Sequence, residues 1–151
     1  MTHLVKSLLN RNLLALVAFA AALAPQALKA NEAKCPLGNA TPRGTYVLTV
    51  DGTGIIVGVG GLTAVGEVTY DGNGIENAQY TASVNGTIYK GVAVTGVYTV
   101  NPDCTGSITE SDGSHYDAVF APDGSTVYWI RTDTGFVISG TEVRFRHADV
   151  D

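Results

Sequence analysis

Two charged side chains inside apolar, strand-like segments could do chemistry. Glu67 lies between Val65 and Thr69 on one face of its segment, and Arg131 ends a face that also carries Trp129. A carboxyl enclosed by apolar groups has a raised pKa and can act as an acid, and ligand sites place a few polar groups in an apolar pocket. Glu67 and Arg131 are therefore candidate catalytic residues. The alternative is that both lie on a solvated outer wall or its rim.

A histidine and a carboxylate form the third candidate. His115 opens a segment two residues before Asp117, and side chains two apart in a strand point to the same face. Such a pair can transfer protons, which makes His115 a candidate catalytic residue. The alternative is an ordinary surface pair at the end of a hairpin, because no serine or cysteine nucleophile is placed beside it.

The common reaction motifs are missing from the sequence. It has no nucleophile elbow, no zinc-protease motif and no phosphate-binding glycine loop. The stretch that begins at Asp71 starts like a calcium loop, but Ile75 and Ala82 occupy two of the ligand positions. We therefore predict a turn there, no metal site and no cofactor.

Alternating apolar and polar residues predict that these side chains sit on strands. Between residues 75 and 84, for example, Ala78, Tyr80 and Ala82 share one face. Turn residues separate the segments, and Asn85-Gly86 is the strongest hairpin signal. The predicted strands are Thr45–Val50, Leu62–Tyr70, Ile75–Val84, Thr87–Tyr89, Val92–Val100, Ser107–Glu110, His115–Phe120, Ser125–Arg131 and Phe136–Arg146, with the glycine-rich stretch 55–61 as either a strand or a mobile loop.

Short connections throughout favour an all-β, single antiparallel up-and-down barrel of about eight strands. A meander of this length avoids exposed edges by closing on itself. A barrel of eight strands holds either packed side chains or one small ligand. The aromatic side chains are mostly expected in the core, with Tyr98 and Trp129 as candidates to line a pocket.

The first thirty residues predict export. A short basic region is followed by the apolar run Leu13–Leu23 and then by small residues, which is the order found in a secretory signal peptide. The run is too short for a membrane span, and we place cleavage after Ala30. The alternatives are a retained N-terminal anchor and, less favoured, a lipoprotein. The predicted divisions are a signal peptide (1–30), an N-terminal segment (31–43), the barrel (44–146) and a flexible tail (147–151).

Export bears on the two cysteines, Cys35 and Cys104, which are the only ones in the chain. An oxidising compartment favours a disulfide between them, which would tie residues 31–43 to the barrel. The alternatives are two free thiols or a metal pair, but two cysteines with no nearby histidine make a poor metal site.

The charge balance excludes one class of partner. Beyond residue 30 the chain carries all 14 carboxylates and only six of its nine cations. Nucleic-acid binding relies on lysine and arginine to neutralise phosphates. From the acidic charge we predict no nucleic-acid partner. From the leader we predict no membrane span in the mature chain and a periplasmic or secreted location.

Several motifs together resemble a group of small exported bacterial β-barrel proteins of unassigned function. These motifs are Gly44-Thr45-Tyr46, the run from Val65 to Gly74, the run from Tyr98 to Gly106, Thr132-Asp133-Thr134-Gly135 and Ser139-Gly140-Thr141. More loosely, the meander resembles the barrels of allene oxide cyclases, dirigent proteins and spirotetronate cyclases. That resemblance implies a lumen that binds apolar, reactive intermediates, and no catalytic motif of those families can be matched to residues here.

Three functions follow from these observations. The first is an exported barrel that binds a small apolar ligand. The second is a cyclase or isomerase that acts on a small apolar intermediate in the same lumen, which needs a polar group deep in the barrel. The third is a structural or partner-binding envelope protein with a filled core. A lumen cavity above roughly 300 Å³ favours the first two.

We expect the exported protein to begin at Asn31. Intact mass spectrometry of protein recovered from the exported fraction measures this directly, since loss of residues 1–30 defines one mass. Recovery of the uncleaved 151-residue chain from membranes would contradict the assignment.

Overall fold

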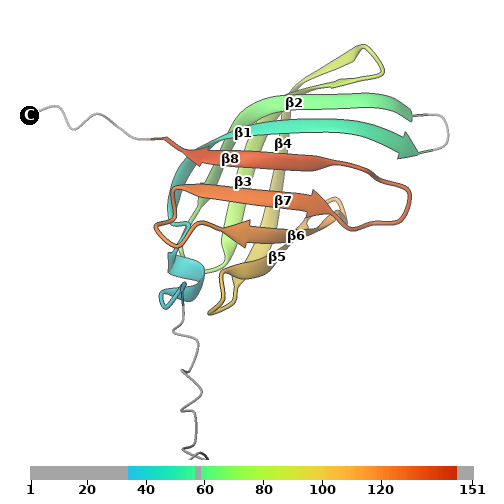
Figure 1. Ribbon diagram of the computed structural model, residues 1–151. Helices are drawn as coiled ribbons and strands as arrows, with labels where there is room; N and C mark the ends of the chain where they lie inside the picture. Colours follow the sequence, from blue (N-terminus) through green and yellow to red (C-terminus); the bar gives the residue numbers. More distant parts are fainter. Residues whose placement is uncertain (1–33, 57–58, 146–151) are drawn as a thin grey trace, which may run out of the picture. The chain divides into compact units, whose positions relative to one another are not determined.

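The computed structural model describes residues 34–56 and 59–145, which form one closed antiparallel β-barrel. Each strand pairs with the next along the chain, and the last returns to the first (Figure 1). The elements are η2 (Gly38–Ala40, a 3-10 turn), β1 (Gly44–Ile56), β2 (Val59–Tyr70), β3 (Ile75–Val84), β4 (Thr87–Val100), β5 (Thr105–Glu110), β6 (His115–Phe120), β7 (Thr126–Arg131) and β8 (Ser139–Arg144). The predicted up-and-down barrel is confirmed. The predicted leader (1–30) and tail (147–151) lie outside the described residues.

Turn chemistry behaves as the sequence predicts at the β3–β4 hairpin. Asn85 and Gly86 both have positive φ, 52° and 80°, as a two-residue hairpin turn of this kind requires. At the β2–β3 turn, the Asp71 carboxylate accepts hydrogen bonds from the backbone N–H groups of Asn73 (2.7 Å) and Ile75 (3.0 Å). The stretch is therefore a turn, as predicted.

Several predicted boundaries are wrong. The first strand, for example, continues to Ile56 instead of ending at Val50. The segments on either side of Gly91 form a single strand, β4, because two residues of β4 lie opposite one residue of β3 at this point. Gly91, with φ of 64°, accommodates this bulge. The last strand begins at Ser139 instead of Phe136, because the preceding residues form the loop between β7 and β8.

The core at one end of the barrel is an aromatic cluster. The side chains of Tyr46, Tyr70, Tyr98 and Phe120 point inward and are at most 2% exposed. Tyr70 packs edge-to-face on Tyr98, with ring centroids 4.8 Å apart, and on Tyr46, at 5.4 Å. Pairs of this geometry add to the stabilisation from burial alone.

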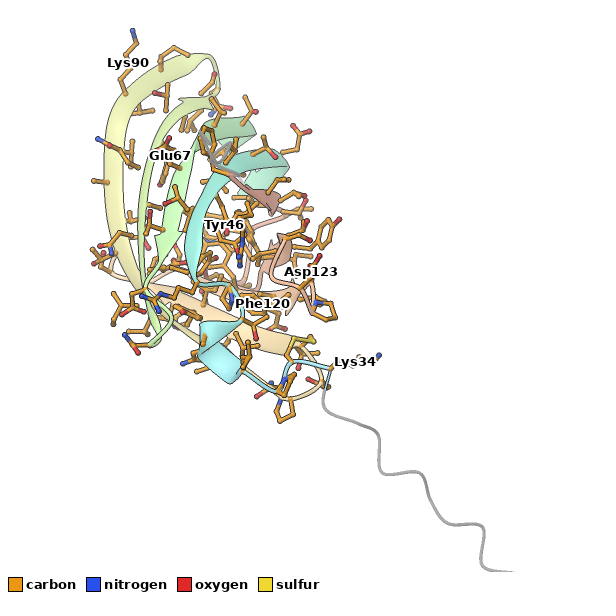
Figure 2. The ribbon with its side chains drawn as sticks, turned by 90° about the vertical axis from the view of Figure 1, so that its left-hand side faces the viewer. Lys34, Tyr46, Glu67, Lys90, Phe120 and Asp123 are labelled. Atoms are coloured by element: carbon orange, nitrogen blue, oxygen red, sulfur yellow. A yellow bond between two sulfur atoms is a disulfide. The ribbon has the colours of Figure 1, made fainter. Side chains whose placement is uncertain are left out.

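Residues 34–43 cover this aromatic end. The disulfide between Cys35 and Cys104 ties them to the turn before β5, which confirms the predicted pairing (Figure 2). The Tyr98 hydroxyl donates to the carbonyl of Asn39 (2.8 Å), and the Asn39 side chain accepts from the backbone N–H of Val100 (2.8 Å). Arg144 donates to the carbonyl of Thr41 (3.1 Å). This end of the barrel is closed, and Lys90 marks the opposite end in Figure 2.

Two glycines make room for inward side chains halfway along the barrel. A Cβ at Gly140 would lie 2.1 Å from the ring of Trp129, and one at Gly96 would lie 2.6 Å from the carboxylate of Glu76. Both side chains can enter the lumen only because their neighbours lack a Cβ. In residues 34–56 and 59–145, no helix is long and apolar enough to cross a membrane.

We expect the double variant Cys35→Ser, Cys104→Ser to be less stable by about 2–4 kcal/mol, because the disulfide closes a long loop in the unfolded chain. Chemical denaturation measures the difference. The β-sheet circular dichroism should persist at low temperature, since the hairpins do not depend on the bridge. An unchanged unfolding midpoint would show that the disulfide does not stabilise the protein.

Candidate functional site

A cavity of about 320 Å³ occupies the lumen at the open end of the barrel. Its size lies at the lower end of the range for small-molecule sites. Apolar and aromatic side chains make up most of its wall, and three charged residues complete it. The lining comprises Leu48, Val50, Leu62, Ala64, Tyr80, Ala82, Val84, Tyr89, Val92, Glu110, Asp112, Tyr116, Trp129, Arg131 and Ile138.

A larger hollow, of about 640 Å³, lies on the outside of the barrel over β4 to β7. Its outward-facing residues are exposed strand positions such as Ser107, Asp117 and Tyr128. It is an open, shallow face without inward charges, whereas the lumen cavity is enclosed by strands and holds titratable groups. We therefore take the lumen as the candidate site.

Arg131 lies at the mouth of this cavity with its charge already paired. Its Nε donates to Oδ2 of Asp133 (2.8 Å), and its guanidinium stacks 3.5 Å from the centre of the Phe136 ring. Its side chain is 19% exposed. The predicted position of Arg131, beside Trp129 on one face, matches the structure, since both line the cavity.

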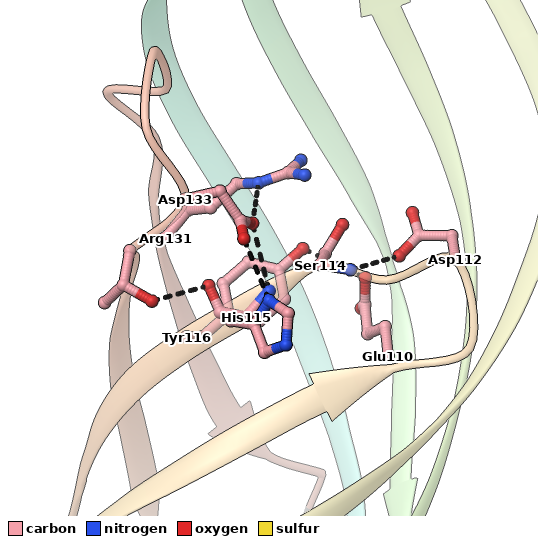
Figure 3. A network of polar contacts seen from close by, with 8 residues as sticks. Glu110, Asp112, Ser114, His115, Tyr116, Arg131 and Asp133 are labelled. Atoms are coloured by element: carbon pink, nitrogen blue, oxygen red, sulfur yellow. Dashed lines mark hydrogen bonds and ion pairs between the residues drawn. The ribbon is translucent and has the colours of Figure 1, made fainter.

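His115 pairs with a different carboxylate from the one the sequence suggested. Its Nδ1 lies 2.9 Å from Oδ1 of Asp133, and its backbone N–H donates to Oδ2 of the same residue (Figure 3). These hydrogen bonds, from the His115 backbone above all, hold the pKa of Asp133 far below its usual range. The His115 side chain is 57% exposed, so it belongs to the rim and not to the cavity wall.

Glu110 brings a carboxyl into the wall of the cavity. Its Oε2 accepts a hydrogen bond from the Tyr116 hydroxyl (2.9 Å). Burial raises the pKa of Glu110, the charge of Asp112 raises it further, and the Tyr116 hydrogen bond and the charge of Arg131 oppose these effects. A carboxyl in this setting retains its proton at a higher pH than an exposed one.

Two further carboxyls, Glu76 and Glu142, lie below the cavity, and each residue is 3% exposed. Glu142 accepts hydrogen bonds from Trp129 Nε1 (2.8 Å) and from the Tyr70 hydroxyl (2.7 Å). A void of about 20 Å³, enough for one water molecule, is lined by residues that include Glu76, Glu110 and Glu142. Burial raises the pKa of Glu76 to about 8, with the Glu142 charge as second cause, and that of Glu142 to about 7.

The structure separates the residues that the sequence singled out. Glu67 is exposed on the outer wall of β2, so its suggested place in the lumen is wrong: it occupies the opposite phase of the strand from the buried Val68. Tyr98 belongs to the closed aromatic end and does not line the cavity. Arg131 and Trp129 do line it.

Sequence reasoning missed Glu76 and Glu110 as lumen residues. The sequence does contain a signal for Glu76, because it lies two residues before Ala78 and therefore on the same face of β3. Glu142 shares the inward phase of the buried Ile138 and Gly140, so the same period of two residues marks it. In the part of the chain that the structure describes, no group of three ligating side chains could hold a metal ion.

Comparisons with known proteins find no family model and no curated protein that matches this chain. Among solved structures, a de novo designed fluorescence-activating β-barrel is 15% identical, with a TM-score of 0.42, over 68% of this chain and 93% of that one. A redesigned β-barrel, mFAP0, bound to DFHBI, is 18% identical, with a TM-score of 0.43, over 69% and 99% of the two chains. Likenesses this distant assign no function and no family.

The buried carboxyls predict stability that falls as the solution becomes alkaline. Folding raises the pKa of Glu76 and Glu142 above the ordinary value of 4.5, so their protonated forms stabilise the fold in acid, and that contribution is lost as the pH rises through about 7 and 8. At about 1.4 kcal/mol per pKa unit, we expect a decrease of several kcal/mol between pH 5 and pH 9, measured by urea denaturation.

Two variants separate this effect from general alkaline sensitivity. Glu76→Gln should be more stable than the wild type at pH 9, because an amide needs no proton to remain neutral. Glu67→Gln, a matched change on the exposed outer wall, should lose as much unfolding free energy between pH 5 and pH 9 as the wild type does. If the wild type, Glu76→Gln and Glu67→Gln all lost the same unfolding free energy between pH 5 and pH 9, the assignment of the raised pKa values would be contradicted.

Proposed function

We propose that this protein is an exported barrel that binds a small, largely apolar ligand in its lumen. The observation that carries the proposal is the cavity of about 320 Å³, whose wall is mainly apolar and aromatic with polar groups on one side. That composition is typical of small-molecule sites. Export is supported by the disulfide between Cys35 and Cys104, since such bonds persist in oxidising compartments.

The arrangement of the two ends supports the same function. Residues 34–43 and the aromatic cluster fill one end, so a ligand would enter from the other, past Arg131 and the β3–β4 hairpin. A lumen that is hollow over part of its length favours ligand binding over a structural protein with a filled core. A partner-binding role would instead use the exposed apolar side chains of the outer wall, such as Val119, Tyr128 and Ile130, which form an open face.

Glu110 favours a second candidate, a cyclase or isomerase acting on a small apolar intermediate. Such an enzyme needs an acid within the lumen, and Glu110 lines the cavity with a raised pKa and a hydrogen bond from Tyr116. In this candidate, Glu110 takes the role that the sequence suggested for Glu67. The loose resemblance to allene oxide cyclases, dirigent proteins and spirotetronate cyclases points in the same direction.

Filling the lumen should abolish binding. Prodan is a small neutral dye whose emission shifts to the blue in apolar surroundings, and we expect it to bind the wild-type protein. Ala82→Phe and Ala64→Phe place a ring in the cavity and should weaken Prodan binding at least tenfold, as measured by fluorescence titration.

Ala93→Phe is the matched control, because Ala93 is exposed on the outer wall of β4. It should bind Prodan like the wild type. Circular dichroism and the unfolding midpoint confirm that each variant is folded. Prodan binding that survives both lumen variants would refute the lumen as the binding site.

A further inference from the structure

The charges around the cavity do not balance. Glu110 and Asp112 contribute carboxyls to its wall, and Arg131 is the one cation among its lining residues. The Arg131 charge is already compensated by Asp133, whose Oδ2 lies 2.8 Å from Nε. The open end of the lumen therefore has an excess of negative charge.

One oxygen of Glu110 has no hydrogen-bond partner among the described residues. Oε2 accepts the Tyr116 hydroxyl, while Oε1 receives no hydrogen bond from any residue that the structure describes. Glu110 is half-buried against the cavity. A carboxylate removed from water is costly, and the raised pKa of Glu110, caused chiefly by burial, reflects that cost even though the charge of Arg131 opposes it. A positive charge in the cavity would reduce the cost of burying this carboxylate.

Aromatic rings line the same cavity. Tyr80, Tyr89, Tyr116 and Trp129 all contribute to the wall, and Tyr116 packs edge-to-face on Trp129 with ring centroids 4.8 Å apart. The face of an aromatic ring attracts a cation, and clusters of such rings recognise quaternary ammonium groups. The remaining wall is aliphatic, which suits the carbon substituents of such a group.

We propose that the lumen binds an apolar amine or quaternary ammonium compound, with its charged nitrogen facing Glu110 and the aromatic rings. This inference rests on the proposed function, since it names the class of ligand for the same cavity. An anionic ligand fits less well, because Glu110 and Asp112 would repel it and Arg131 is already engaged by Asp133 and Phe136.

Several other charged or titratable groups lie around Glu110, so the experiment must isolate it. They come from four strands and a turn, and they are Glu76 and Tyr80 of β3, Asp112 of the β5–β6 turn, Tyr116 of β6, Arg131 of β7 and Glu142 of β8. A ligand whose charge does not change with pH, together with a variant of Glu110 alone, separates its effect from theirs.

The test compares benzyltrimethylammonium with neopentylbenzene, its neutral isostere of nearly the same shape, by displacement of Prodan from the disulfide-bonded protein. At pH 8 we expect the ammonium compound to bind at least tenfold more tightly than the isostere. At pH 4.5 that advantage should shrink to less than threefold, because Glu110 then carries a proton.

Glu110→Gln should remove the advantage at pH 8 while leaving the affinity for neopentylbenzene unchanged. Asp117→Asn, a matched change on the exposed outer wall, should preserve it. Loss of the advantage in Glu110→Gln, with retention in Asp117→Asn, supports the proposal.

Three results would overturn it, and they differ from a failure of the proposed function. These are equal affinity for the two compounds, an advantage that persists in Glu110→Gln, and tighter binding of phenylacetate, which would assign the site to Arg131. In each of these cases Prodan still binds the lumen. If Prodan itself fails to bind the wild-type protein, the proposed function fails as well.

Discussion

Closure of the barrel by the pairing of β8 with β1 is the constraint on which the rest of the structure depends. The register sets Leu48 opposite Glu142 and Val50 opposite Gly140, so every second residue of both strands is directed into one shared lumen. A carboxyl on an open sheet could remain in water, but in a closed barrel Glu142 must find its partners inside. Trp129 and Tyr70 supply them. The missing Cβ of Gly140 gives Trp129 the space to do so. Closing the barrel therefore decides which polar side chains meet inside the lumen.

The two ends of the lumen show how polar groups can be treated inside a barrel. At the closed end, the hydroxyl of Tyr98 both donates to Asn39 and accepts from the backbone N–H of Gly72, and Arg144 bridges Tyr46 and Thr41. One buried polar atom there, Thr41 Oγ1, has no hydrogen-bond partner in the described part of the chain. At the open end, Glu110 lines the cavity, and among the described residues its carboxyl has one hydrogen-bond donor, Tyr116. The two ends therefore differ in that the open end sets a carboxyl beside a cavity, whereas packed aromatic side chains fill the closed end.

The sequence predicts the architecture well because local rules decide it. Alternation sets the faces of β3, and Asn85-Gly86 sets its hairpin, without reference to distant residues. The contents of the lumen depend on closure and on long-range register, which local rules do not contain. His115 meets Asp133 across the β6–β7 pairing and not Asp117 on its own strand. Glu76 is buried although charged residues are normally exposed, because Gly96 on the adjacent strand leaves room for its carboxyl.

The three lumen carboxyls also connect stability with ligand choice. Glu76 and Glu142 are neutral inside the barrel when they retain their protons, so they need no partner of opposite charge. The fold is less stable at alkaline pH, where these protons are lost. Glu110 is less deeply buried and lines the cavity, so a bound cation can neutralise its carboxylate. Burial depth therefore divides chemically identical groups into two kinds. The two that lie below the cavity, out of reach of a ligand, are neutralised by protons, and the one in the cavity wall is free to be neutralised by a bound molecule.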